Sequence, residues 1–174
     1  MISSRPTSYA EYYRRAYAIL DELTPLRTDC GVVCGKACCQ GDETQGMRLF
    51  PHERTALPVT DTEDGGKLAV CAGTCCRADR PLACRIFPLF PYIHDDGHIS
   101  VETDLRAYRL CPLATHAEAV RFDPQFVRAV RQVGRLLAQD PEIRAYMKEV
   151  SAEIDIFRQF YNKHGRPSAR IRRG

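Results

Sequence analysis

The sequence lacks several features that would place it in a familiar class of protein. It has no run of about 18 apolar residues, so we expect no membrane-spanning helix. The stretch MISSRPTSYAEYYRR has no apolar core after its first charges, so we expect no secretory signal. No internal repeat is present. These absences favour a globular protein of the reducing cytoplasm.

Motifs of common enzyme classes are also missing. The chain has no glycine-rich phosphate loop and no nucleophile elbow. The candidates for an open catalytic metal site are His52, His94, His98, His116, Asp42 and Glu53. No H-x-x-H or H-E-x-x-H arrangement is present, so we interpret these histidines as single exposed residues, with PHER at 51–54 typical of a helix start. The sequence leaves open whether the protein is an enzyme.

The size and charge of the chain indicate one globular domain over residues 1–174. A length of 174 residues is enough for one core and short for two domains of ordinary size. The net charge is +3, but five of the 25 basic residues lie from Lys163 onward, which leaves 20 basic residues against 22 acidic ones. We therefore expect a solvated basic tail over 165–174, and no nucleic-acid binding by the rest of the chain.

Helices are predicted at both ends of the chain. Ser8 and Glu11 form a capping box for a helix over about 8–23, which Pro25 ends. Each of the pairs Asp123-Pro124 and Asp140-Pro141 places an N-cap before a proline at the first helical position. The two apolar stripes that follow are Phe126, Val130, Val133 and Leu137, and Ile143, Met147, Val150, Ile154, Phe157 and Tyr161. We predict a helical C-terminal part over 112–164 whose last stripe packs on the body, with a homodimer seam as the alternative to a monomer.

The centre of the chain, residues 30–111, is rich in glycine, proline and cysteine and has little long-range periodicity. KLAVCA (67–72) predicts a short strand, DDGH (95–98) predicts a hairpin turn, and DTEDGGK (61–67) predicts a polar loop. The expected fold is therefore an α-rich α+β single domain, in which helices flank an irregular cysteine-rich centre. A centre with so little regular structure needs another source of order, and bound metal can supply it.

Nine cysteines stand out in this composition. They fall in three groups, which are Cys30, Cys34, Cys38 and Cys39, then Cys71, Cys75, Cys76 and Cys84, and then Cys111 alone. Two C-x3-C pairs have the spacing that lets two sulfurs reach one ion. If CGKACC opens a helix, Cys34 and Cys38 share a face while Cys39 points about 100° away. In a reducing compartment this pattern predicts metal binding rather than disulfides.

The residues around the cysteines fit the same interpretation. Glycines crowd the cysteine segments, where tight turns are needed to wrap an ion. The cations expected to offset a thiolate site are Lys36, Arg77, Arg80, Arg85 and Arg109. In RPLACRIFPLFPY (80–92), we expect Phe87, Phe90 and Tyr92 to form an apolar wall beside Cys84.

The blocks CGVVCGKACC, CAGTC and RPLACRIFP, in this order, resemble the YkgJ-type cysteine-cluster family, described as a zinc- or iron-chelating domain and sometimes as an iron–sulfur oxidoreductase. The likeness covers about 30–111. It implies a metal-binding set of Cys30, Cys34, Cys38, Cys39, Cys71, Cys75 and Cys84, with Cys111 as an eighth member, and it leaves Cys76 as an extra residue.

Two kinds of metal protein remain as hypotheses. Eight thiolates can make two closed four-sulfur zinc sites with no catalytic role. Alternatively, they can hold iron or an iron–sulfur cluster for redox chemistry. The spacings match neither ferredoxin pattern, and C-x3-C-x3-C runs one residue longer than a radical-SAM motif. We therefore favour zinc over iron.

Overall fold

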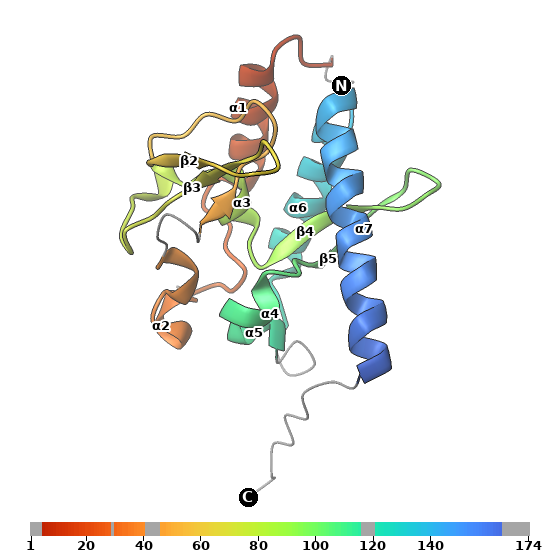
Figure 1. Ribbon diagram of the computed structural model, residues 1–174. Coiled ribbons are helices and arrows are strands. Elements are labelled where there is room, and N and C mark those ends of the chain that lie inside the picture. Colours follow the sequence, from red (N-terminus) through yellow and green to blue (C-terminus); the bar gives the residue numbers. More distant parts are fainter. Residues whose placement is uncertain (1–4, 29, 41–45, 116–120, 165–174) are drawn as a thin grey trace, which may run out of the picture.

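Helices from the two ends of the chain pack against each other and against a β-hairpin from the centre (Figure 1). We describe a computed structural model that covers residues 5–28, 30–40, 46–115 and 121–164. It forms a single α+β domain with 48% helix, well above the third that is typical of globular proteins. The predicted α-rich fold class is therefore confirmed. No helix among the described residues is long and apolar enough to cross a membrane.

The elements follow one another along the chain as short pieces in the centre and long helices at the ends. In chain order they are α1 (Tyr9–Leu20), α2 (Gly31–Cys34), η1 (Ala37–Cys39), β1 (Met47–Arg48), β2 (Val59–Asp61), β3 (Lys67–Ala69), η2 (Arg77–Asp79), α3 (Leu82–Ile86), β4 (Leu89–Ile93), β5 (Ile99–Thr103), α4 (Ala107–Leu110), α5 (Pro112–Thr115), α6 (Pro124–Leu137) and α7 (Pro141–His164).

The predicted N-caps begin the long helices. The Ser8 hydroxyl accepts a hydrogen bond from the Glu11 amide at 3.3 Å, and the Asp123 carboxylate accepts one from the Gln125 amide at 2.8 Å. Asp140 Oδ1 accepts from two amides at the start of α7. The first helix ends at Leu20 rather than near Leu23, because the chain leaves helical geometry at Asp21, whose φ is 26°.

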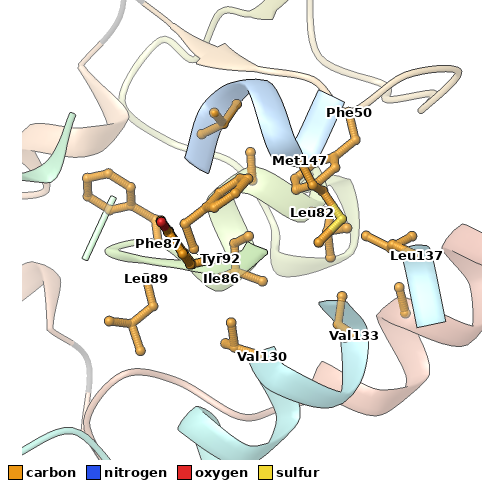
Figure 2. Packing of buried hydrophobic residues seen from close by; sticks show 14 of the residues in the cluster. Phe50, Leu82, Ile86, Phe87, Leu89, Tyr92, Val130, Val133, Leu137 and Met147 are labelled. Carbon is orange, nitrogen blue, oxygen red and sulfur yellow. The ribbon is translucent and has the colours of Figure 1, made fainter. Parts of the chain in front are cut away.

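Both predicted apolar stripes enter the core, and Figure 2 shows Val130, Val133 and Leu137 of α6 with Met147 of α7 among the packed side chains. From the second stripe, Ile143, Met147, Val150 and Ile154 are buried, while Phe157 is half-buried beside Tyr108. The side chain of Tyr161 and the tail 165–174 lie outside what the structure describes. The buried members of the α7 stripe pack on the chain's own core. Among the described side chains of α7, the large exposed apolar ones are Ile156 and Phe160.

Two small antiparallel sheets lie in the centre. β4 and β5 pair from Leu89 with Thr103 to Ile93 with Ile99, and the predicted DDGH turn joins them. The other sheet has the order β1-β3-β2, so KLAVCA does contribute a strand. The predicted polar loop at 61–67 contains the turn between β2 and β3, while its end residues Asp61 and Lys67 pair with each other in the two strands. Between the cysteine groups, the centre is thus more regular than its sequence suggested.

One predicted helix start is wrong. PHER at 51–54 forms a turn, because His52 has a φ of 60° and the Glu53 amide bonds to the Phe50 carbonyl at 3.1 Å. In Figure 1, α7 runs along one side of the molecule, while the three-stranded sheet and α2 lie on the other. The cysteine-bearing segments belong to this second side and to the short helices below the hairpin.

Candidate metal centre

Cysteines from four separate parts of the chain line one cavity of about 110 Å³. They are all eight members of the predicted set, namely Cys30, Cys34, Cys38, Cys39, Cys71, Cys75, Cys84 and Cys111. Cys76 is not among the described residues that line this cavity. Its side chain is exposed and its sulfur donates to Asp79 Oδ2 at 2.9 Å. None of the nine cysteines forms a disulfide.

The first cysteine group is split by a reversal of the chain. Cys30 is the N-cap of α2 and Cys34 is its last residue, so the two lie one helical turn apart. Gly35 and Lys36 then both adopt left-handed geometry, with φ values of 58°, before η1 begins. Glycine suits the first of these positions, since it has no Cβ to strain. CGKACC therefore does not open a helix, and the condition under which Cys34 and Cys38 would share one helix face is not met.

The second group is held beside the first by a short piece of strand pairing. Gln40 forms an isolated antiparallel bridge with Ala72, and the Gln40 amide side chain donates to the Gly35 carbonyl at 3.0 Å. Cys71 is the second residue after β3 and is 8% exposed. Cys84 lies within α3 and is half-buried. This pairing brings segments about thirty residues apart to the same cavity wall.

Cys111 reaches the cavity from the opposite end of the centre. It lies between α4 and α5 and is 8% exposed. Burial raises the pKa of Cys111, while the backbone amides of Leu113 and Ala114 act in the opposite direction.

The sulfurs surround the cavity without meeting at one point. Among the described residues, no three His, Cys, Asp or Glu side chains already stand close enough together to hold a metal ion. The sulfurs of Cys38 and Cys39 are 4.0 Å apart. Zn–S bonds of about 2.3 Å give a four-sulfur tetrahedron an edge of about 3.8 Å. A metal would therefore need side-chain movements that bring its ligands together.

Four of the cavity thiols have raised pKa values. Burial, followed by the charges of Cys39 and Cys75, raises the pKa of Cys84 to about 12. The hydrogen bond with Cys39, together with burial, raises the pKa of Cys38, and burial raises the pKa of Cys71 and of Cys111. Any metal that binds these sulfurs must displace their protons.

Four of the five predicted cations line the cavity: Lys36, Arg77, Arg80 and Arg85. Arg109 is exposed and is not among the described lining residues. Burial opposes the charge of Arg80, but its hydrogen bond with Cys75 and the charges of neighbouring thiols raise its pKa overall. Its Nε atom is buried and finds no hydrogen-bond partner among the described residues.

Arg77 and Arg85 also fix the cavity wall to the rest of the fold. Arg77 donates to the carbonyls of Asp21 and Leu23 at 2.6 and 2.7 Å, just after α1. Arg85 donates to carbonyls of the segment 77–80 and lies 4.4 Å from the centre of the Tyr17 ring. These contacts were not evident from the sequence, which indicated only that cations lie near cysteines.

The predicted apolar wall is only partly present. Phe87 lines the cavity, together with Pro88 and Met47. Phe90 and Tyr92 do not, because they belong to β4 and pack in the hydrophobic core. The Tyr92 hydroxyl donates to Asp155 of α7 at 2.6 Å.

The residues proposed for an open catalytic site lie elsewhere. His52 stacks on Tyr9 and contacts Glu142 at 2.9 Å, in a separate groove. His94 and His98 lie in the loop between β4 and β5. Glu53 is 6% exposed and accepts hydrogen bonds from the amides of Phe50 and Leu82 and from the Tyr17 hydroxyl. Asp42 and His116 lie outside the described residues.

Compared with known proteins, the chain matches no family model, no curated protein and no solved structure. The resemblance to the YkgJ-type family therefore stays a prediction. The donor set itself is informative: the cavity gathers eight thiols and four cations, and no described residue that lines it is a histidine, an aspartate or a glutamate.

Proposed function

We propose that this protein binds zinc through the eight cysteines of the cavity. The observation that carries the proposal is their convergence, since they come from α2 and η1, from the turn after β3, from α3 and from the junction of α4 and α5. Packing alone gives no reason for eight small side chains of one type to collect around one cavity. The family resemblance does not include Cys76 in the metal-binding set, and Cys76 is also the one cysteine that does not line the cavity.

The chemistry of the donors favours zinc. Thiolates select thiophilic ions such as Zn²⁺, Cu⁺ and iron, and disfavour Mg²⁺ and Ca²⁺. Zinc forms closed four-sulfur tetrahedral sites, and eight thiolates suffice for two of them. Such sites keep no open position for a substrate, so the metal would have a structural role. A cytoplasmic location fits nine cysteines without a disulfide.

The charge around the cavity supports a strongly negative centre. Two zinc ions held by eight thiolates would carry a formal charge of about −4. Lys36, Arg77, Arg80 and Arg85 line the same cavity and supply four positive charges. The Arg80 Nε–H without a partner among the described residues is a further donor available to a thiolate.

When bound, zinc supplies cross-links between chain segments that are far apart in sequence, and this binding free energy adds to folding stability. The cysteines would hold the ions, while Arg77 and Arg85 attach the second cysteine segment to the end of α1. The protein would then be a zinc-chelating domain in which the folding of the cysteine-bearing segments depends on bound metal.

The apolar part of the cavity favours an iron–sulfur redox centre as a second candidate. Met47, Phe87 and Pro88 line the cavity, and an apolar surround limits solvent at a cluster and tunes its potential. This candidate uses the same cysteines, so the two functions differ in the metal and not in the site.

Elemental analysis and a visible spectrum of anaerobically purified protein test the proposal. We expect about two zinc ions per chain and no visible absorption, because zinc has a filled d shell. A brown preparation with stoichiometric iron would select the redox candidate. A protein that contains neither metal, and takes up neither after reduction, would refute both.

A further inference from the structure

The outer side of α7 carries an apolar stripe that is separate from the buried one. Ile156 and Phe160 are 67% and 59% exposed, and Ala152 is exposed one turn before them. At 100° per residue, these three side chains fall within about 80° of one another, on the side of the helix opposite the buried stripe. The helix itself runs along the outside of the molecule (Figure 1). Two large apolar side chains at i and i+4 thus face solvent together.

Charged residues of opposite sign lie at the two ends of this stripe. Glu149 lies seven residues before Ile156 and Lys163 lies seven residues after it, so both share its face of the helix. Both side chains are exposed, and neither belongs to the ion pairs that α7 forms within the described part of the chain. About 21 Å of helix separates them, so they cannot pair within one chain.

A second copy of α7 matches this stripe when it lies antiparallel, with a two-fold axis at Ile156. In that arrangement Ile156 faces its own copy and Ala152 faces Phe160. At both ends of the contact, Glu149 faces Lys163. The small side chain leaves room for the large one, as close helix packing requires, and each acidic residue meets a basic one. The contact is isologous, so every pairing occurs twice.

Other occupants of the surface match it less well. A parallel second helix would place Glu149 opposite Glu149 and Lys163 opposite Lys163, and like charges in contact are unfavourable. The segment 165–174 has four arginines, one large apolar residue and no acidic residue. It therefore offers little apolar area to the stripe and no partner for Lys163.

We propose that the protein forms a two-fold symmetric homodimer through the outer side of α7, with the two helices antiparallel and Ile156 at the axis. The sequence suggested a dimer seam as the other use of the inner stripe of α7, but four residues of that stripe are buried in the chain's own core. The dimer therefore uses the opposite side of the helix. The contact spans about 21 Å of one helix from each chain, which is small for an interface, so the dimer is weak and reversible.

Analytical ultracentrifugation of the full chain measures this association. A reductant is included, because the chain has nine cysteines that could otherwise cross-link. Between about 1 μM and about 1 mM, we expect a monomer–dimer equilibrium. A wild type that stays monomeric over this whole range would overturn the proposal. The test does not depend on which metal the cavity binds.

Ile156→Asp tests the centre of the contact. It would bring two carboxylates together at the axis, so the dissociation constant should rise at least about 10-fold. Val59→Asp makes the same change at another exposed apolar residue, in β2, and is the matched control. It should leave the dissociation constant unchanged. Equal weakening by both variants would contradict the assigned surface.

Exchanging the end charges tests the antiparallel register. Glu149→Lys alone, or Lys163→Glu alone, would place like charges opposite each other at both ends of the contact. Each should weaken the dimer about 5- to 30-fold at low ionic strength. The double variant restores both pairings and should associate as the wild type does. A double variant as weak as the single ones would contradict the register.

A measurement on the wild type covers variants that do not fold. A zero-length carbodiimide joins a carboxylate to an amine only where the two are in contact. It should link Glu149 to Lys163 in the cross-linked dimer, a product that the helix length forbids within one chain. Cross-linked dimers without this peptide would refute the arrangement. Removal of 165–174 should leave the dissociation constant unchanged; a dimer that forms only after this removal would identify the tail as the occupant and overturn the proposal.

Discussion

Glu53 is a buried carboxylate that accepts a hydrogen bond from the helix carrying Cys84. Its Oε1 atom accepts from the Leu82 amide at 2.5 Å and from the Tyr17 hydroxyl at 2.6 Å, and its Oε2 atom accepts from the Phe50 amide at 3.2 Å. Leu82 is the first residue of α3, the helix that carries Cys84. Glu53 therefore ties this helix to α1 and to the turn at 50–53.

Glu53→Ala would leave two backbone amides without their acceptor in a buried environment. Each unsatisfied amide costs about 1 to 3 kcal/mol, so we expect a loss of about 2 to 6 kcal/mol in the free energy of unfolding. For a domain of this size, that corresponds to a fall in Tm of roughly 5 to 20 °C. Glu53→Gln keeps one oxygen that can accept from the Leu82 amide and the Tyr17 hydroxyl, so its loss in the free energy of unfolding should be about half that of Glu53→Ala.

Thermal and urea unfolding of the two variants, followed by circular dichroism, measure this effect. Zinc content should stay the same in both, because Glu53 is not among the described residues that line the cysteine cavity. The reasoning is refuted if Glu53→Ala unfolds within about 0.5 kcal/mol of the wild type, the range of an ordinary surface change. Loss of zinc without loss of stability would instead indicate a direct role at the metal.

The pH dependence of the free energy of unfolding, compared between the wild type and Glu53→Gln, tests the pKa shift of Glu53. Burial raises the pKa of Glu53 even though its hydrogen-bond donors act in the opposite direction. A carboxyl with a raised pKa contributes most stability below its ordinary value of 4.5, and this contribution is lost as pH rises through the folded-state value. The stability advantage of the wild type over Glu53→Gln should therefore narrow from acid to neutral pH. A gap that widens over this range would show the opposite sign of the shift.

Three further outcomes are expected. Chelator treatment of the wild type should lower Tm, and it should reduce the protection of backbone amides from hydrogen exchange more in the cysteine segments than in α6 and α7. Equal amide protection with and without metal would contradict this. Cys76 should be alkylated first in the zinc-loaded protein, and Cys76→Ala should keep full zinc content, since this thiol is exposed and outside the cavity. Gly134→Ala should destabilise the fold by about 1 to 3 kcal/mol despite better helix propensity, because the new Cβ would lie 2.5 Å from Pro91 Cβ; an unchanged urea midpoint would show that the hairpin yields without cost.

By itself, the sequence determined the features that depend on neighbours along the chain. The Asp-Pro pairs and the apolar stripes predicted α6 and α7, and DDGH predicted the β4–β5 turn. Caps, helical periodicity and turns act over a few residues, so they can be read without the fold. The cysteine spacing and the family resemblance also nominated the eight residues that line the cavity.

The tertiary structure decided everything that depends on residues meeting across the fold. The sequence left open whether a helix runs through Cys38, and left-handed geometry at Gly35 and Lys36 shows that α2 ends before it. Glu53 looked like a catalytic candidate, but the packing of α1 and α3 around it makes it a buried hydrogen-bond acceptor. Likewise, the strand bridge of Gln40 with Ala72 and the position of Cys111 between α4 and α5 bring distant cysteines to one cavity. Such contacts join segments tens of residues apart, and no local pattern in the sequence encodes which of them meet.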